Sequence, residues 1–447
     1  MQINELKQLL RENGIVGAGG AGFPSYAKLD LRASTVILNC AECEPLLKLH
    51  RQMLEKYAYE IVSTLAAIAD TVEADEFVIA VKGSYKGAVS AVKNVIGEFK
   101  KGRIGILPEM YPAGDEVVTI YETTGRVVPP GNLPISVGCI VYNVETVYNM
   151  YCALNSNSPV THKYVTVAGE VKEPKTIKAP LGTTFKTLID MCGGVTAENT
   201  RIISGGPMTG NLADEYSVVT KTTNGILVMP ENHEIVLKRL ANAQLEIKRA
   251  MSVCCQCRAC TELCSRNLLG QPIAPHKFMR ALSRNVITNP QDMINTMYCS
   301  SCGICEMYAC PQGLNPRSLI AEYKAGLRKN GIKPMPLTEF DNVREDREYR
   351  LLPMHRLKER LDLVKYDINA PITEEMPNEK RIKIMLSQHI GAPAKPVVKS
   401  GDKVAASQVI AKTDDSALGV NIHAPKNGTV EEITDKFIII AADAGKE

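Results

Sequence analysis

The sequence has no excess of charge of one sign. Its 52 lysines and arginines against 49 aspartates and glutamates leave a formal net charge of +3, and no long run of like charge stands out. Proteins that bind nucleic acid or anionic membranes usually carry a basic patch or stretch. Nucleic acid is therefore not an expected partner.

Long apolar runs are also missing. Apolar stretches such as residues 61–68 are far shorter than the ~18 residues that a membrane-spanning helix needs. Met1 leads into an amphipathic segment, whereas a secretory leader has a basic stretch followed by an apolar one. We therefore expect a protein that does not span a membrane and lies in the cytoplasm.

The composition is that of packed globular domains. Hydrophobic residues make up 45% of the 447 residues and charged residues 23%, which excludes a fibrous or disordered chain. At about 150 residues per domain, this length predicts roughly three domains.

Cysteine, in contrast, is abundant, with fourteen residues. Cytoplasmic thiols stay reduced, so clustered cysteines there more often hold metal than form disulfides. Eight of them form two runs, C-x2-C-x2-C-x3-C and C-x2-C-x2-C-x4-C-P. The runs are Cys254, Cys257, Cys260 and Cys264, and Cys299, Cys302, Cys305 and Cys310.

These spacings predict two [4Fe-4S] clusters. Three closely spaced cysteines can hold three corners of a cubane, and in two-cluster ferredoxins the fourth cysteine of each run ligates the other cluster. The predicted ligand sets are therefore Cys254, Cys257, Cys260 and Cys310 for the first cluster, and Cys299, Cys302, Cys305 and Cys264 for the second. Structural zinc is the alternative, since it also uses C-x2-C pairs. Cys255 stands beside Cys254 and is either a bystander or an exchangeable ligand.

Residue patterns divide the chain into five parts. In residues 1–158, β-rich runs alternate with helical stretches, which predicts an α/β domain with a largely parallel sheet. Residues 159–235 combine short strands with one helix, and residues 236–330 are helical and hold both cysteine runs. Residues 331–380 are rich in proline and charge and predict an extended linker. Residues 381–447 predict a small all-β sandwich or barrel.

Residues 17–22, GAGGAG, match the pattern G-x-G-x-x-G. A dinucleotide-binding fingerprint follows a strand and opens a helix, but this loop follows a predicted helix, so an ordinary Rossmann site is not indicated. Four glycines still allow the backbone to approach a phosphate or a flavin closely. A tight packing loop is the alternative.

The loop belongs to a longer series of motifs. Residues 17–28, GAGGAGFPSYAK, are followed by NCAECEP at 39–45, YPAGDE at 111–116 and NVET at 143–146. In this order they resemble the FMN domain of the RnfC and complex I flavin-subunit family. The resemblance implies a Rossmann-like FMN domain whose FMN-binding residues are Gly17, Gly19, Gly20, Gly22, Lys28, Asn39, Asn143 and Thr146, with Glu42, Glu44 and Glu145 as weaker candidates.

The resemblance covers nearly the whole chain. Residues 162–230 resemble the SLBB β-grasp module, and residues 386–393 and 423–430 resemble the barrel-sandwich hybrid module of RnfC. RnfC carries that module at its N-terminus, whereas here it lies at the C-terminus, as in soluble relatives that include cobalamin reductases and a proline reductase electron-transfer protein. Two positions depart from the complex I pattern: Ala18 replaces an arginine, and Ser84 a glutamate near the nicotinamide.

Together, these features predict an NADH-dependent oxidoreductase. FMN would take a hydride from NADH and pass single electrons to the two clusters, and a corrinoid or a redox partner protein would accept them. The alternative is a relay subunit of a larger reductase that does not itself oxidise NADH. The resemblance also allows a homo-oligomer or complex subunit, located in the cytoplasm or inside a bacterial microcompartment.

Overall fold

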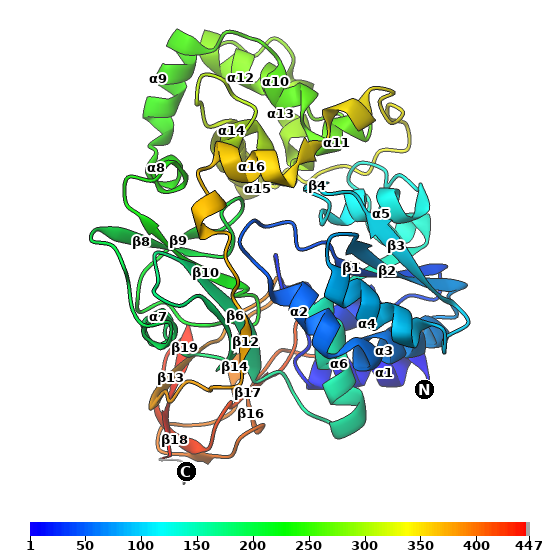
Figure 1. Ribbon diagram of the computed structural model, residues 1–447, viewed down its shortest axis with the longest axis vertical. Coiled ribbons are helices and arrows are strands. Elements are labelled where there is room, and N and C mark those ends of the chain that lie inside the picture. The colour runs from blue at the N-terminus through cyan, green and yellow to red at the C-terminus, as the bar shows by residue number, and fades with distance from the viewer. Residues whose placement is uncertain (444–447) are drawn as a thin grey trace.

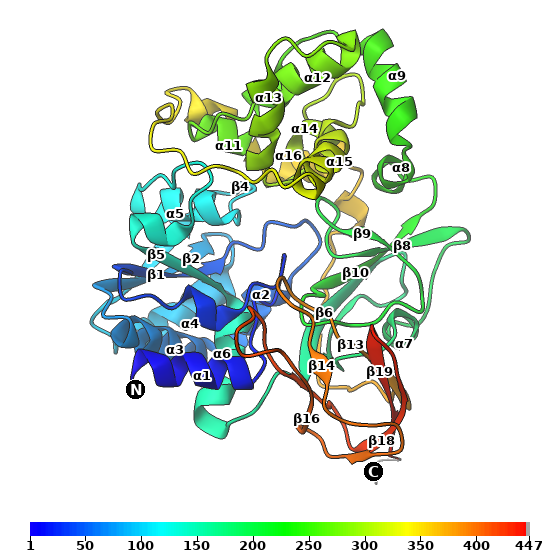
Figure 2. The ribbon, with the colours of Figure 1, turned by 180° about the vertical axis from the view of Figure 1, so that it is seen from behind.

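The computed structural model describes residues 1–443. Figures 1 and 2 show an α/β domain at the N-terminus, a β-rich module beside it, a helical domain across one end and a small β module at the C-terminus. These parts agree with the multidomain α/β fold expected from the sequence.

The N-terminal domain is built on a parallel sheet with strand order β3-β2-β1-β5. Its strands are β1 (Thr35–Cys40), β2 (Glu76–Lys82), β3 (Gly102–Leu107) and β5 (Cys139–Asn143). Successive apolar residues of each strand face opposite sides, so that Val36 and Leu38 enter one core and Ile37 another. A parallel sheet covered on both faces binds ligands outside the carboxyl ends of its strands.

Helices cover both faces of this sheet. On one face pack α1 (Ile3–Glu12), α2 (Leu49–Lys56), α3 (Ala58–Thr71), α4 (Lys86–Ile96) and α6 (Val144–Ser156). The other face is covered by α5 (Glu116–Thr124), which follows the two-residue strand β4 (Met110–Tyr111).

The β-grasp module has a mixed sheet of six strands in the order β12-β7-β6-β10-β8-β9. Its own strands are β6 (His162–Gly169), β7 (Lys175–Pro180), β8 (Thr200–Ser204), β9 (Asn211–Ala213) and β10 (Gly225–Pro230), and α7 (Phe185–Met191) packs on them. The central pair, β6 and β10, is parallel.

The cysteine domain is helical, as the sequence predicts. Its helices are α8 (Glu234–Leu240), α9 (Ala243–Val253), α10 (Ala259–Glu262), α11 (Ser265–Leu268), α12 (Pro275–Arg284), α13 (Pro290–Ile294), α14 (Ile304–Met307) and α15 (Pro316–Lys329). Ala250, Phe278 and Ile320 are central members of a small apolar core that joins α9, α12 and α15.

Residues 331–380, predicted as an extended linker, are instead packed onto two other parts of the chain. They form β11 (Leu352–Pro353), which pairs with β4, α16 (Met354–Arg360), and β12 (Ile372–Thr373), which extends the β-grasp sheet. The apolar residues between the prolines of this segment, including Leu357, Leu361 and Leu363, are buried in a shared core, and this burial fixes the segment.

The C-terminal module consists of two small sheets. The first has the order β13-β19-β18-β15 and the second the order β14-β16-β17. The strands are β13 (Arg381–Met385), β14 (Lys395–Pro396), β15 (Lys403–Val404), β16 (Val409–Lys412), β17 (Ile422–His423), β18 (Gly428–Ile433) and β19 (Phe437–Ala442). Residues 444–447 of the predicted module lie outside the described residues.

This module is docked on the N-terminal domain. The backbone N–H of Ile390 donates to the carbonyl of Ala21 at 2.9 Å, and Arg11 donates to the carbonyl of Asp414 at 2.7 Å. None of the helices within residues 1–443 is long and apolar enough to cross a membrane.

Candidate flavin and iron–sulfur sites

A cavity of about 520 Å³ lies where the α/β domain, the β-grasp module and the cysteine domain meet. We call it the central cavity. Of the residues predicted to bind FMN, all but Glu145 line it: Gly17, Gly19, Gly20, Gly22, Lys28, Asn39, Glu42, Glu44, Asn143 and Thr146.

The glycine loop is tied to the first turn of α6. The backbone N–H of Ala18 donates to Thr146 Oγ1 at 2.9 Å, and Gly17 and Phe23 pair across the base of the loop. Gly20 has a φ of +63°, and a Cβ there would meet no protein atom within 4 Å, so its backbone faces open space. Glycine at this position is required for conformation.

Two asparagines lie side by side at the carboxyl ends of adjacent strands. Asn39 of β1 and Asn143 of β5 are register partners. Asn39 donates to the Gly114 carbonyl at 3.0 Å and accepts from the Ala41 N–H at 3.1 Å, which fixes its orientation. Asn143 caps α6 by accepting from the Glu145 N–H at 2.9 Å.

His50 lines the central cavity, although the sequence did not nominate any histidine. Burial lowers the pKa of His50 to about 3, so the ring is neutral. Because Asn143 Oδ1 is occupied by the helix cap, its Nδ2 donates to His50 Nε2 at 3.0 Å. No metal spacing or motif marks this histidine, and only the packing of α2 against the cavity brings it there.

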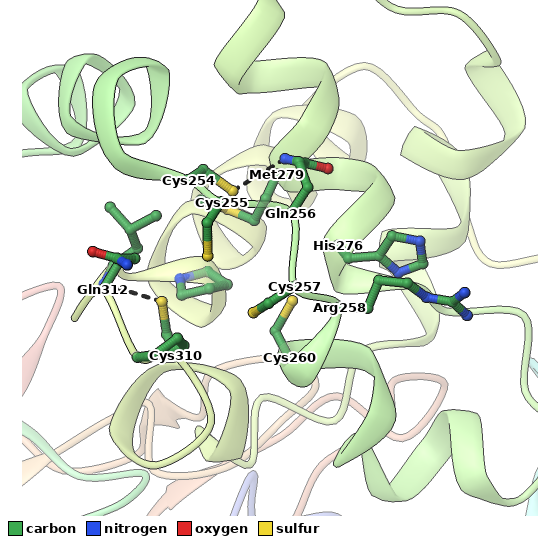
Figure 3. Close-up of a pocket in the computed structure, with 13 residues that line it drawn as sticks. Cys254, Cys255, Gln256, Cys257, Arg258, Cys260, His276, Met279, Cys310 and Gln312 are labelled. Atoms are coloured by element: carbon green, nitrogen blue, oxygen red, sulfur yellow. Dashed lines mark hydrogen bonds between the residues drawn. The ribbon is translucent and has the colours of Figure 1, made fainter.

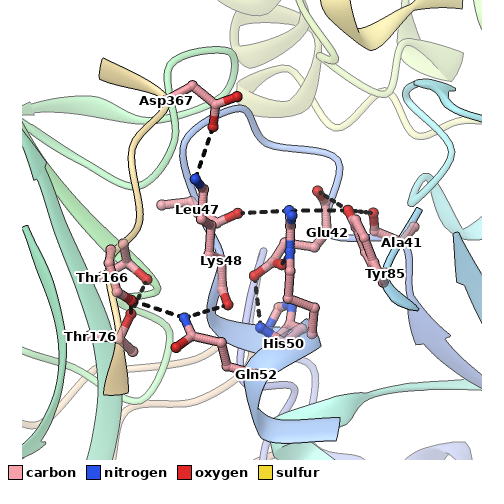
Figure 4. Close-up of polar contacts among 12 residues, drawn as sticks. Ala41, Glu42, Leu47, Lys48, His50, Gln52, Tyr85, Thr166, Thr176 and Asp367 are labelled. Atoms are coloured by element: carbon pink, nitrogen blue, oxygen red, sulfur yellow. Dashed lines mark hydrogen bonds and ion pairs between the residues drawn. The ribbon is translucent and has the colours of Figure 1, made fainter. Parts of the chain in front are cut away.

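Glu42 holds the start of α2 in place (Figure 4). It has a φ of +39°, and its carboxylate accepts from the His50 N–H at 2.7 Å and pairs with Arg51 at 2.8 Å. Arg51 in turn lies 4.0 Å from the centre of the Tyr85 ring. Burial raises the pKa of Glu42, and the Arg51 guanidinium opposes this effect.

The predicted site residues Glu44 and Glu145 have structural partners. Glu44 accepts from the N–H groups of Met208 and Thr209 at 2.9 Å each, and so connects the α/β domain to the β-grasp module. Glu145 is 1% exposed and forms a buried ion pair with Lys163 behind the cavity. It therefore does not line the cavity with the others.

Lys28 supplies a cation at the cavity wall. Its ammonium donates to Glu116 and to the Val141 carbonyl, both at 2.8 Å. Together with the open glycine backbone and the amides of Asn39 and Asn143, it provides donors for a phosphate or a flavin ring. The cavity volume lies in the range of about 300–1,000 Å³ typical of cofactor sites. The residues present therefore fit FMN.

The first cysteine set surrounds a cavity of its own (Figure 3). Cys254, Cys257 and Cys260 come from the turn between α9 and α10, and Cys310 arrives from beyond α14. Cys255 borders the same cavity, so the choice between it and Cys254 as ligand stays a prediction.

The second set comes together in the same crossed fashion. Burial, together with the neighbouring thiols of Cys302 and Cys299, raises the pKa of Cys264 to about 12. Cys305 likewise has Cys299 and Cys302 as close neighbours. The fourth cysteine of each run thus lies with the triplet of the other run. Within residues 1–443, no three His, Cys, Asp or Glu side chains form a site for a single metal ion.

The two cysteine loops share one backbone conformation. Two residues after the first cysteine stand Gln256 and Ser301, and both have positive φ. Four residues after it stand Arg258 and Gly303, again with positive φ, and each begins a one-turn helix. Thiols also accept hydrogen bonds, as Cys310 does from the Leu314 N–H at 3.4 Å. The loops therefore repeat one wrapping geometry suited to a cubane.

The second cysteine set adjoins the central cavity, whereas the first set reaches the surface. Ser300 and Cys302 line the central cavity, and the Tyr111 hydroxyl donates to the Cys302 carbonyl at 2.5 Å. Arg266 pairs with Asp115 at 2.9 Å across the same boundary. At the other end, Cys257 is exposed.

Family models match four stretches of the chain. They are the Nuo51 FMN-binding domain over residues 10–152, the SLBB domain over 164–212, the 4Fe-4S dicluster domain over 253–315 and the RnfC barrel sandwich hybrid domain over 364–444. With the cavities described above, these matches define a flavin and iron–sulfur oxidoreductase whose cofactors are FMN and two [4Fe-4S] clusters.

Whole-chain comparison is more specific. The chain is 38% identical to the cobalamin reductase PduS of Salmonella typhimurium, over 98% of this chain and 97% of that protein. It is also 38% identical to PduS of Citrobacter freundii, over 97% and 96%. A component of the proton-translocating ferredoxin:NAD(+) oxidoreductase complex of Clostridium ljungdahlii is 35% identical over 60% of this chain and 57% of its own length. The chain belongs to the PduS cobalamin reductase family.

Proposed function

We propose that this protein carries electrons from NADH to a corrinoid, in the order central cavity, second cysteine set, first cysteine set. The observation that carries this order is the position of the two sets. Cys302 borders the central cavity, and Cys257 of the other set is exposed. When bound, FMN supplies the exchange between two-electron and one-electron transfer.

The protein's own part is to bind and align. The Tyr111–Cys302 hydrogen bond and the Arg266–Asp115 ion pair hold the cysteine domain against the rim of the cavity. Each cysteine triplet lies with the fourth cysteine of the other run, so the two loops would hold two clusters next to each other. In this proposal the ten predicted flavin residues that line the central cavity and the eight cysteines keep the roles predicted above, whereas Glu145 lies behind the cavity.

NADH as donor is supported by the family and by one local contact. Ser84 stands where the complex I flavin subunit has a glutamate, but the carboxylate of Glu109 accepts from the Ser84 N–H at 3.1 Å. A carboxylate is therefore present beside this loop although the chain position differs. The corrinoid acceptor is supported by the relatives named cobalamin reductase.

A relay role within a larger reductase is the second candidate. The exposed Cys257 fits this role as well as the first, because a partner protein could accept electrons there. Anaerobic titration with NADH, followed by absorbance and EPR, tests the donor. If NADH bleaches the flavin and reduces both clusters, the isolated chain oxidises NADH. If it does not, while dithionite reduces the clusters, the relay role is supported. Adding cob(III)alamin or cob(II)alamin to the reduced protein then tests the acceptor, because a corrinoid acceptor should reoxidise the flavin and the clusters.

The cellular location stays a prediction: the cytoplasm or the interior of a bacterial microcompartment. Two experiments would test it: fluorescence microscopy of the tagged protein in its native host, and co-purification of the protein with microcompartment shells. Association into homo-oligomers or complexes also stays a prediction, and light scattering of the holoprotein measures it.

A further inference from the structure

Asn224 belongs to the β-grasp module but lines the central cavity. It stands immediately before β10, whereas most of the cavity wall comes from the α/β domain. Its side chain lies beside Gly19: a Cβ on Gly19 would come within 2.5 Å of Asn224 Nδ2. The glycine loop and the β-grasp module therefore meet at this amide.

The orientation of the amide follows from its other neighbour. Lys163 Nζ donates to Asn224 Oδ1 at 2.7 Å and to the Tyr164 carbonyl at 3.2 Å, and it forms an ion pair with Glu145. These contacts use all three ammonium hydrogens, and an ammonium cannot accept a hydrogen bond. Asn224 must therefore present its oxygen to Lys163 and its NH₂ group to the glycine loop.

That NH₂ group has no acceptor among residues 1–443, and it borders a cavity that fits FMN. Lys163 is 1% exposed and Glu145 is 1% exposed, so this orientation is held from inside the protein. A buried ion pair is costly to form. Here the pair of Lys163 and Glu145 holds an amide whose NH₂ group is left without a protein acceptor and faces the cavity.

We propose that Asn224 is an FMN-binding residue contributed by the β-grasp module, donating a hydrogen bond to an acceptor atom of FMN beside Gly19. Lys163, held by Glu145, is the positioning residue of this amide. This contact also explains why residue 19 is glycine: any Cβ there would clash with the Asn224 side chain and displace it. The inference rests on FMN occupying the central cavity but not on NADH or a corrinoid.

The test is FMN affinity, measured by fluorescence quenching as the anaerobically prepared, flavin-free protein with intact clusters is titrated. Asn224→Ala removes the donor and should weaken binding about 3- to 10-fold, the value of one hydrogen bond. Asn224→Asp replaces the donor with an acceptor and should weaken it at least as much. Asn211→Asp makes the same change on the exposed surface of the same module and should leave binding unchanged.

A double-mutant comparison separates direct contact from general damage. Gly19→Ala should weaken FMN binding in the wild-type background, because the new Cβ displaces Asn224. In the Asn224→Ala background the same change should cost much less. Equal losses in the two backgrounds, or wild-type affinity in both Asn224 variants, would overturn the proposal. If these results hold while NADH fails to reduce the protein, only the proposed donor is wrong.

The positioning role needs a spectroscopic readout. Glu145→Gln/Lys163→Met removes both charges together, since removing one would leave the other buried and unpaired. The amide can then rotate, and the absorption spectrum of bound FMN should shift to that of Asn224→Ala. Adding Asn224→Ala to this pair should change it no further. A spectrum like the wild type would show that Lys163 does not position Asn224.

Discussion

The Tyr111 hydroxyl donates a hydrogen bond to the backbone carbonyl of Cys302, at 2.5 Å. Tyr111 belongs to the α/β domain and is 3% exposed, and Cys302 belongs to the second cysteine set. Both residues also line the central cavity. This one contact therefore joins the predicted flavin site to the cysteine set that adjoins it.

Removing that hydroxyl should loosen the junction. Tyr111→Phe leaves the part-buried Cys302 carbonyl without its partner and should cost about 0.5–1.5 kcal/mol of stability. We expect full loading with FMN and iron, a lower thermal midpoint, and slower reduction of the clusters after the flavin is reduced. Stopped-flow absorbance separates the two phases. Tyr59→Phe, at a half-exposed tyrosine, is the control, and cluster reduction at the same rate in both variants would contradict the prediction.

Crossed ligation predicts which cluster each fourth cysteine supports. Cys310→Ser should damage the first cluster and Cys264→Ser the second, each lowering iron from about eight to about four per chain. Because the second set adjoins the central cavity, NADH should still reduce the remaining cluster in Cys310→Ser but only poorly in Cys264→Ser. Iron analysis and EPR measure both effects. Cys152→Ala, outside both runs, should keep all the iron, and zinc in place of iron throughout would refute the cluster assignment.

The backbone of Gly20 makes a prediction about the glycine loop. Its φ of +63° costs a residue with a side chain about 1–2 kcal/mol. Gly20→Ala should therefore lower FMN affinity about 5- to 30-fold, because the loop relaxes away from the binding conformation. Gly20→Asn should lose less, since asparagine tolerates this conformation. The matched control is Gly97→Ala, where φ is −62° and nothing lies within 4 Å. Unchanged affinity in Gly20→Ala would mean that the loop only packs.

Lys221 joins three parts of the chain. It is 1% exposed, and its ammonium donates to the carbonyls of Gly14 at 2.7 Å and Asn421 at 2.9 Å. Burial without a carboxylate lowers the pKa of Lys221 to about 7. Between about pH 7 and 10 the unfolded chain therefore binds more protons at this residue than the folded chain does, so this residue makes stability rise with pH.

The rise attributable to Lys221 is at most ~1.4 kcal/mol for each pH unit. Lys221→Met removes the titrating group and should flatten the stability profile of the holoprotein between about pH 7 and 9. Thermal midpoints across this range are the measurement. Lys403→Met, at an exposed lysine of β15, should keep the wild-type slope. A wild-type slope in Lys221→Met would show that the lysine is protonated throughout.

Residue patterns alone specify the iron–sulfur clusters and much of the architecture, and the family resemblance of the glycine loop and its neighbouring motifs adds FMN. The two cysteine triplets predict two [4Fe-4S] clusters because three of the four ligands of each cubane come from one short stretch of the chain. Alternating strands and helices specify a largely parallel sheet. The strand order, which places Asn39 beside Asn143, was seen only in the structure. The clusters and the type of sheet depend on neighbours in the chain or on a regular fold, so they could be predicted before the structure was known.

Contacts between domains, in contrast, follow only from the folded molecule. Tyr111 and Cys302 are 191 residues apart, and no pattern in either segment encodes their contact. The same holds for His50 in the cavity wall, for Asn224 beside Gly19, and for the burial of Leu357 in a segment whose prolines predicted a free linker. Such contacts depend on how complete domains pack against each other. Local residue preferences do not determine this packing, because it involves surfaces formed by distant parts of the chain.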